Sequence, residues 1–348
     1  MRLSISSSNR RWLLIGVVTM LLGAAIATGV EFGWRSQGYV PNVIDSMQLW
    51  SQQRDRVYAT DKTPLVMLGA SRIEFGVDMP RMRALLPGHE PVMLALNGRY
   101  PLAALEDLAN DADFHGTVIC DLEPNGMLRE FRSMQRPYVD YYHRQWTPNW
   151  RLHRTILTVW QRSSLIADPR FGLIASLRHA LDGGKPFRDY IRFHADRSGD
   201  IDYQLTDPEA AKRHFEATVE GNIKGLPQRS AEEWFSDIQP IFAWIRQIQA
   251  RGGQVILYQS PLHGLQRQVM QRLYPDGPYW DRIAAASPGP VLDGNRIDSL
   301  AVFSLPDDSH LDFRDKPAYT EALVEVLLAH HVFDNPAPVL SHDRLTAR

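Results

Sequence analysis

A serine near the start of this sequence and an aspartate–histidine pair near its end have the residue types of a nucleophile, an orienting acid and a base. Ser71 follows Gly69 by two positions, and Asp307 precedes His310 by three. A serine hydroxyl attacks an acyl carbon when a base removes its proton, and an imidazole does this if an acceptor on its other nitrogen fixes the tautomer. One tight turn could present Asp307 and His310 together. These three residues are therefore candidate catalytic groups for ester hydrolysis or acyl transfer.

Such chemistry also needs hydrogen-bond donors for the charge that develops on the acyl oxygen. The backbone N–H groups of Ser71 and Gly98 and the side-chain amide of Asn125 are the candidate donors, because each belongs to a polar segment that follows an apolar run. Asn125 fits the part of an ordinary turn residue equally well, since Pro124 precedes it and Gly126 follows it.

Three further polar residues stand close to these groups in the sequence. Arg72 could bind an anionic part of a substrate, although pairing with an acid such as Glu123 is the simpler expectation. His263 is a candidate substrate-binding residue or alternative base without a local acid partner, and Asp308 replaces Asp307 if the turn shifts by one residue. The histidines and aspartates lack the spacing of metal ligands, so we expect neither a metal nor another cofactor.

The candidate groups follow short apolar runs that are typical of buried strands. These runs cover residues 64–69, 91–96, 117–122, 254–258 and 289–292. Segments with helical spacing separate them, and this alternation implies a mainly parallel sheet covered on both faces. In such a sheet ligands collect at the carboxyl ends of the strands. We therefore expect an α/β fold, a three-layer sandwich of the flavodoxin-like type.

The expected helices cover residues 43–58, 79–86, 102–109, 230–250 and 317–330. Ser230 and Glu233 at the start of the fourth helix form a capping-box pattern. Residues 130–229 interrupt the rhythm and read as a mainly helical insertion, with a hairpin over residues 189–205 around Ser198 and Gly199. This insertion is rich in aromatic and basic residues. Core packing is the simplest explanation for them, and a lid or carbohydrate-facing surface is the alternative.

The order of these motifs resembles the SGNH hydrolase superfamily, whose members are also called GDSL-like. Gly-x-Ser follows the first strand, a glycine the second and an asparagine the third, while Asp-x-x-His precedes the last helix. The resemblance implies that Ser71 is the nucleophile, that Gly98 and Asn125 complete an oxyanion hole with Ser71, and that Asp307 and His310 complete the triad. It covers roughly residues 62–130 and 230–330 and leaves the insertion unmatched.

The sequence departs from the family pattern in two places. Ala70 stands where the family has aspartate before the serine, and no glycine precedes Asn125 in the third block. Gly-x-Ser-Arg behind an N-terminal apolar segment resembles the envelope branch of the superfamily. That branch includes proteins linked to O-acetylation of exopolysaccharides and to D-alanylation of cell-wall polymers, which shifts the expectation from hydrolysis towards acyl transfer.

The N-terminus predicts attachment to a membrane. Three arginines in the first 11 positions precede an uncharged run over residues 12–30, 19 residues long, which is near the lower limit for a spanning helix. The basic flank predicts a cytoplasmic N-terminus and an extracytoplasmic location for the rest. Residues 25–27 form an Ala-x-Ala site, so a cleavable signal peptide is the competing interpretation. We favour an uncleaved anchor because the apolar run continues past that site.

The expected organisation is a cytoplasmic tail over residues 1–11, an anchor over 12–31, a stalk over 32–60, the SGNH-like domain over 61–335 and a tail over 336–348. The net charge of −2 leaves no basic field for nucleic acid. The single cysteine, Cys120, allows no internal disulfide, and its apolar surroundings predict a buried structural thiol.

Two functions are compatible with the sequence. The first is a single-pass protein of the inner (cytoplasmic) membrane with a periplasmic serine esterase or O-acyltransferase domain. It would act through acyl-Ser71 on an envelope polysaccharide or another acyl acceptor, with a membrane protein as a conceivable acyl donor. The second is a non-catalytic SGNH-like module that binds polysaccharide or scaffolds an envelope assembly, because folds persist after their chemistry is lost.

Overall fold

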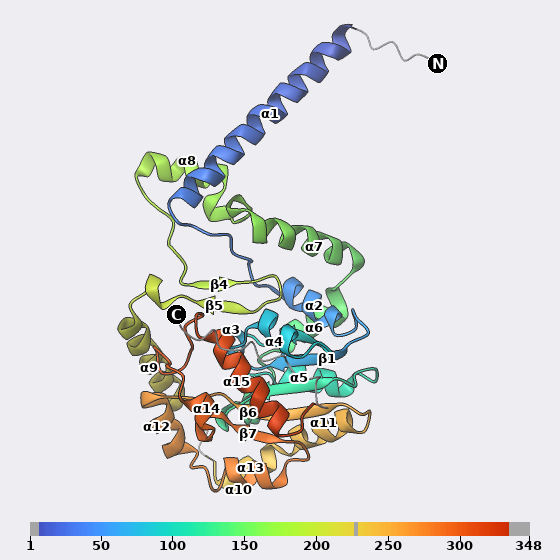
Figure 1. The fold of residues 1–348 in the computed structure, drawn as a ribbon, viewed down its shortest axis with the longest axis vertical. Helices are drawn as coiled ribbons and strands as arrows, with labels where there is room; N and C mark the ends of the chain where they lie inside the picture. The colour runs from blue at the N-terminus through green and yellow to red at the C-terminus, as the bar shows by residue number, and fades with distance from the viewer. Residues whose placement is uncertain (1–6, 226–228, 334–348) are drawn as a thin grey trace, which may run out of the picture. The chain divides into compact units, whose positions relative to one another are not determined.

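The computed structural model describes residues 7–225 and 229–333. The contacts between residues divide the chain into two compact units. The N-terminal unit consists of the residues up to Ile44 together with Leu152–Asp189. The sheet unit consists of Asp45–Arg151 and the residues from Tyr190 onward. Figure 1 shows the elements of both units.

The sheet unit is built on a five-stranded sheet in which every neighbouring pair of strands is parallel. The strands are β1 (Thr63–Leu68), β2 (His89–Met93), β3 (Thr117–Asp121), β6 (Gln254–Gln259) and β7 (Val291–Asp293). Most of their residues are buried, as the continuous apolar runs predict for strands covered on both faces. The α/β fold class expected from the alternating strand and helix pattern is confirmed.

The strands lie in the order β2-β1-β3-β6-β7. From β1 the chain first moves to one side, to β2, and then returns to the other side of β1 to form β3, β6 and β7. The carboxyl ends of β1 and β3 therefore flank the topological switch point, where α/β sheets of this order bind their ligands. The loop after β1 carries Ser71, and the loop after β3 carries Asn125.

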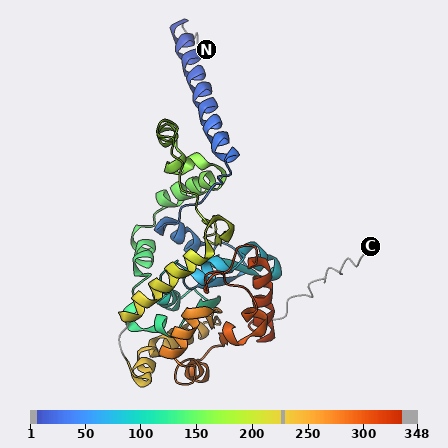
Figure 2. The same cartoon turned by 90° about the vertical axis from the view of Figure 1, so that its left-hand side faces the viewer.

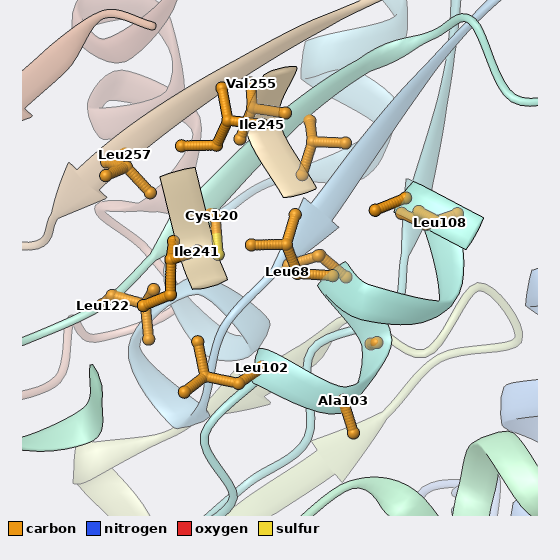
Figure 3. Packing of buried hydrophobic residues seen from close by; sticks show 14 of the residues in the cluster. Leu68, Leu102, Ala103, Leu108, Cys120, Leu122, Ile241, Ile245, Val255 and Leu257 are labelled. Atoms are coloured by element: carbon orange, nitrogen blue, oxygen red, sulfur yellow. The ribbon is translucent and has the colours of Figure 1, made fainter. Parts of the chain in front are cut away.

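Alternate strand residues pack into two separate hydrophobic layers. Val66 and Leu68 face a layer that contains residues of α5 and α11, whereas Leu65 and Met67 face a layer that contains residues of α4 and α15. Figure 3 shows part of the first layer, in which the fully buried Cys120 lies among leucine, isoleucine and valine side chains. Burial raises the pKa of its thiol, and the predicted structural role of Cys120 is confirmed. The helices that contribute to the two layers are α2 (Met47–Arg56), α3 (Ser71–Gly76), α4 (Met79–Leu85), α5 (Leu102–Asn110), α6 (Arg136–Gln145), α10 (Ala231–Asp237), α11 (Gln239–Gln249), α13 (Trp280–Ala286), α14 (Asp298–Ala301) and α15 (Lys316–Ala329). The sheet unit also contains α12 (Gly264–Leu273).

The N-terminal unit begins with the long helix α1 (Ser7–Ser36). Its stretch Arg10–Ser36 is long and apolar enough to cross a membrane. The unit also contains most of α7 (Pro148–Ser163), the short 3₁₀ helices η3 (Leu165–Ala167) and η4 (Pro169–Phe171), and α8 (Leu173–Asp182). Two aromatic residues near the end of α1 pack against side chains of η3 and η4. In both Figure 1 and Figure 2, α8 lies at the C-terminal end of α1.

Three predicted boundaries are corrected by the structure. The first helix of the sheet unit begins at Met47 rather than at residue 43, because Ser46 caps it by accepting a hydrogen bond from Leu49 N (3.2 Å). The second strand ends at Met93, since the chain turns at Asn97 and Gly98 shortly afterwards. The helix predicted over residues 230–250 is two helices.

The break between α10 and α11 has a local cause. Pro240 stands in the first turn of α11 and has no N–H to continue the hydrogen bonding of α10. The capping box of Ser230 and Glu233 at the start of α10 is confirmed.

The region predicted as an insertion contains α6, α7, α8, α9 (Pro208–Lys224) and one hairpin. The hairpin consists of β4 (Ile191–Phe193) and β5 (Gly199–Ile201), which pair antiparallel as expected. Its turn lies before Ser198, with Arg197 at a φ of 67°. A Cβ atom at Gly199 would overlap the ring of Phe75 in α3, so this hairpin packs closely on the helix that follows β1.

Candidate active site

Ser71 is the first residue of α3, directly after the turn that leaves β1. Gly69 makes this turn possible. A Cβ atom there would lie 2.5 Å from Ile73 Cγ2 and 2.9 Å from Asp121 Cβ, closer than real side chains approach. The N-cap of α3 is Ala70, which supplies no side-chain hydrogen bond. Ser71 therefore does not act as a helix cap, and its hydroxyl is available to another partner.

That partner is His310. Ser71 Oγ lies 2.7 Å from His310 Nε2, although 239 positions separate the two residues in the chain. His310 Nδ1 lies 2.8 Å from Asp307 Oδ2. Asp307 Oδ1 accepts hydrogen bonds from the backbone N–H groups of Ser309 (3.0 Å) and His310 (2.7 Å), which hold the carboxylate in place. The structure thus brings together Ser71, His310 and Asp307 in the geometry of a serine–histidine–aspartate triad.

The charge state of Asp307 suits the role of an orienting acid. Burial alone would raise the pKa of this carboxyl group, but the hydrogen bond and charge of His310 outweigh it and lower the pKa to about 2. Asp307 is therefore ionised at neutral pH and able to stabilise an imidazolium at His310. His310 is buried beside the rings of Phe75 and Phe215, whereas Ser71 is only half-buried.

The structure distinguishes Asp307 from its neighbour Asp308. The carboxylate of Asp308 points to α9, where Oδ2 lies 2.9 Å from Lys212 Nζ. Its backbone has a φ of 67°, and its carbonyl oxygen accepts a hydrogen bond from His263 N (2.9 Å). His263 therefore contacts the loop of Asp307 and His310 through its backbone N–H. A role of its imidazole in binding substrate stays a prediction.

Gly98 lies in a turn that is bonded to the Ser71 loop. Arg99 N donates to Leu96 O (3.0 Å) across this turn, and Leu96 N donates to Gly69 O (3.1 Å). Gly98 has a φ of 69°, a backbone conformation that favours glycine. Nε2 of the fully buried Gln135 donates to Gly69 O (3.2 Å) and to Arg99 O (3.0 Å), which ties the two loops together.

Asn125 lies against the same turn through Tyr100. Its side-chain Nδ2 donates to Tyr100 Oη (2.8 Å), while its buried Oδ1 has no hydrogen-bond partner among the described residues. A half-turn of the amide would let the Tyr100 hydroxyl donate to Oδ1 and would release Nδ2 as a donor. A Cβ atom at Gly126 would overlap the Tyr100 ring, so the glycine after Asn125 is what allows this close packing.

Arg72 forms an ion pair with Glu123, whose side chain is almost fully buried. Gln266 Nε2 also approaches Glu123 Oε1, at 3.4 Å. Pairing with an acid, the simpler expectation for Arg72, is what the structure shows, and contact of Arg72 with a substrate stays a prediction. The pair links the helix of Ser71 to the loop that leads to Asn125.

Sequence reasoning missed a buried charge network behind the nucleophile. Arg197, from the hairpin turn, is fully buried and binds both carboxylate oxygens of Asp45 (2.8 and 2.9 Å) and Glu74 Oε1 (3.1 Å). Glu74 Oε2 in turn accepts the N–H of Asn97 (2.7 Å), the residue before Gly98. Burial raises the pKa of Glu74 to about 8 although Arg197 opposes this shift, because the single guanidinium is shared with Asp45. In the sequence, this network is signalled only by the acidic residue Glu74, one helical turn after Ser71.

Comparison with known proteins adds little to this geometry. No family model matches the chain, and no curated protein matches its sequence. The solved structure titled "Crystal Structure of TesA" aligns over 76% of this chain and 98% of that chain, at 12% identity and a TM-score of 0.34. A similarity this low supports no conclusion about function, so the site is interpreted from its own contacts.

Changing Gly69 to alanine is expected to displace Ser71. The added methyl group has no space beside Ile73 and Asp121, so the turn must shift. We expect a loss of about 1–3 kcal/mol of stability, the usual cost of overpacking, together with a loss of whatever reactivity the Ser71 hydroxyl has towards esters. Thermal unfolding and p-nitrophenyl acetate turnover measure the two effects. Gly88→Ala is the matched control, because nothing lies within 4 Å of the added methyl group. Equal behaviour of the two variants would contradict the argument.

Replacing Arg197 by methionine is expected to cost about 3–5 kcal/mol of stability, because it leaves the carboxyl groups of Asp45 and Glu74 without their buried partner. Arg192→Met is the matched control: its guanidinium is 39% exposed and pairs with Asp200, and such pairs contribute about 1 kcal/mol or less. Urea unfolding measures both.

The raised pKa of Glu74 adds a pH dependence to the same experiment. A carboxyl group whose pKa rises on folding stabilises the protein when protonated, and this contribution is lost as the pH rises through about 8. Glu74→Gln should therefore lose less stability than the wild type as the pH rises from the ordinary carboxyl pKa of 4.5 to about 8. An unchanged pH profile in Glu74→Gln would show that Glu74 is ionised in the folded protein.

Proposed function

We propose that this protein is an SGNH-type serine esterase or O-acyltransferase that works through an acyl-enzyme at Ser71. The observation that carries the proposal is the continuous chain of hydrogen bonds from Ser71 Oγ through His310 to Asp307. An aspartate that stays ionised next to a buried imidazole, which in turn contacts a half-buried serine, has few other chemical uses. The order of the motifs along the chain supports the SGNH assignment.

In the proposed reaction His310 Nε2 accepts the Ser71 proton while Oγ attacks the acyl carbonyl carbon. The N–H groups of Ser71 and Gly98, and Asn125 Nδ2 after rotation of its amide, bind the resulting oxyanion. The imidazolium then donates its proton to the departing alcohol oxygen, which leaves the acyl group on Ser71. His310 next deprotonates an incoming hydroxyl, which attacks the ester and releases Ser71. Water as the acceptor gives hydrolysis, and a sugar hydroxyl gives acyl transfer.

We place this chemistry on the outer side of the cytoplasmic membrane and propose an envelope polysaccharide or another acyl acceptor as the substrate. The long apolar helix α1 and the arginines before its apolar stretch support that location. A membrane protein that delivers acyl groups is a proposed partner. The resemblance to the envelope branch of the superfamily favours transfer over hydrolysis.

A non-catalytic SGNH-like module that binds polysaccharide or scaffolds an envelope assembly is the second candidate. The contact that favours it is the hydrogen bond from Asn125 Nδ2 to Tyr100, because it directs one of the two N–H donors of this amide to the tyrosine and not to an oxyanion. In such a module the triad would persist as structure without turnover.

Labelling with a fluorophosphonate separates the two candidates. The reagent phosphonylates a serine only when a base and an oxyanion hole activate it. The full-length protein in detergent should gain the mass of the adduct on the peptide that contains Ser71, and p-nitrophenyl acetate hydrolysis should stop in parallel. A protein that stays unlabelled and inert but binds polysaccharide would establish the module instead.

A further inference from the structure

Helix α7 buries polar side chains and exposes apolar ones. Arg154 and Gln161 are buried, and they bond the backbone of Ile44: Arg154 Nη2 donates to its carbonyl oxygen (3.1 Å), and Gln161 Oε1 accepts its N–H (3.4 Å). On the opposite face Leu152, Ile156, Val159 and Trp160 are between 48% and 64% exposed. A surface helix of a soluble protein normally has the reverse pattern.

Helix α8 repeats this arrangement. Its side towards α1 carries Ser176, whose Oγ accepts a hydrogen bond from Trp34 Nε1 (2.8 Å), and His179, whose ring contacts Trp34 edge-on. Its outer stripe consists of Leu173, Ile174, Leu177 and Leu181, which are between 48% and 79% exposed. Two neighbouring helices thus present apolar stripes that nothing among the described residues covers, and exposed stripes of this kind mark interaction surfaces.

The segment that connects α7 to α8 is bound to α1 at the point where the uncharged stretch of α1 ends. That stretch runs to residue 30, and the next residue, Glu31, caps the 3₁₀ helix η3, which follows α7. Its carboxylate accepts the N–H groups of Leu165 (3.0 Å) and Ile166 (3.2 Å) and the hydroxyl of Ser164 (2.8 Å). Figures 1 and 2 show α8 at this end of α1. If α1 spans a bilayer, α7 therefore ends and α8 begins close to its surface.

We infer that the apolar stripes of α7 and α8 lie in the outer interfacial layer of the bilayer that α1 crosses. The same unit contains the apolar stretch of α1, whose large side chains from Trp12 to Ile26 are exposed like those of the stripes. Trp160 belongs to the stripe of α7, and the exposed Arg178 flanks the stripe of α8, as suits the boundary between acyl chains and phosphate headgroups. The inference rests on the membrane attachment in the proposed function, and it adds two interfacial helices to a single span.

Spin labels on the full chain test this placement. The chain is reconstituted singly into nanodiscs of phosphatidylethanolamine and phosphatidylglycerol, with Ile156→Cys or Leu177→Cys carrying the label. Arg162→Cys and Asp182→Cys are the matched controls, since both are exposed residues outside the stripes. Gly23→Cys, in the middle of α1 with open space around it, reports whether the helix is inserted. Native Cys120 is fully buried and does not compete for the label.

The readout is the collision rate of each label with oxygen, which enters lipid, relative to a neutral nickel chelate, which stays in water. Oxygen should dominate at positions 156 and 177 as it does at 23, and nickel should dominate at both controls. Nickel access at 156 and 177 with a lipid-exposed position 23 would overturn the inference and leave the anchor intact. Shielding from both reagents would overturn it in favour of a protein contact. Nickel access at position 23 would overturn the anchor itself, and p-nitrophenyl acetate turnover in the same samples tests the chemistry separately.

Discussion

Ser71→Ala is expected to reduce turnover of p-nitrophenyl acetate by a factor on the order of 10⁶. The variant keeps His310 and Asp307 but removes the oxygen that forms the acyl-enzyme. A water molecule is not fixed at the position of Ser71 Oγ and cannot replace it. The fold should persist, because a half-buried hydroxyl is lost without leaving a large cavity. Fluorophosphonate labelling of the same peptide should disappear.

Ser309→Ala is the matched control for that experiment. Ser309 stands next to His310 and is buried, and its hydroxyl has no hydrogen-bond partner among the described residues. Its removal should leave turnover within a few-fold of the wild type and should not reduce stability. Wild-type turnover in Ser71→Ala would refute the acyl-enzyme mechanism, and a loss in Ser309→Ala as large as that in Ser71→Ala would show that the assay reports the fold and not the nucleophile.

Asp307→Asn is expected to lower kcat by a factor on the order of 10⁴, the effect of the same change in a serine protease triad. The amide oxygen can still accept the N–H groups of Ser309 and His310 that bond Asp307 Oδ1. Its NH₂ group then faces His310 Nδ1 and forces the ring proton onto Nε2. The imidazole thereby presents a donor to Ser71 where it should accept a proton.

Asp308→Asn is the control, because it removes a neighbouring charge that pairs with Lys212 and not with His310. Its turnover should stay within a few-fold of the wild type. Since the pKa of Asp307 is lowered to about 2, protonation of Asp307 itself makes no contribution to the deficit around neutrality. A larger loss in Asp308→Asn than in Asp307→Asn would show that Asp308, and not Asp307, is the orienting acid.

Whether the natural reaction is hydrolysis or transfer depends on what reaches acyl-Ser71 first. Acetylated enzyme made with p-nitrophenyl acetate can be offered water alone or water with an envelope polysaccharide. Faster release in the presence of the polysaccharide, with acetyl esters found on it, would establish transfer. The placement of α7 and α8 in the interface would matter here, since the proposed acyl-delivering membrane protein and the proposed polymer acceptor would both be met at that surface.

The residues that determine local structure can be identified from the sequence. Apolar runs that end in glycine or polar residues predict the five strands, and their alternation with helices predicts a parallel sheet, because these patterns depend on neighbours in the chain. From that sheet the position of Ser71 in the loop after β1 follows directly. The Asp-x-x-His spacing likewise allowed both groups to share one turn before the last helix.

The pairing of groups from distant segments was decided only by the tertiary structure. The contact of Ser71 with His310, the selection of Asp307 over Asp308 and the ion pair of Arg72 with Glu123 all depend on how loops meet at the sheet edge. Arg197 is hidden among many arginines until packing buries it against Glu74. The exposed stripe of α7 was equally invisible, because periodicity shows that a helix has an apolar face but not which way that face turns. Sequence patterns predict the local structure of each segment. Burial and charge pairing depend on which segments come into contact, so only the tertiary structure determines them.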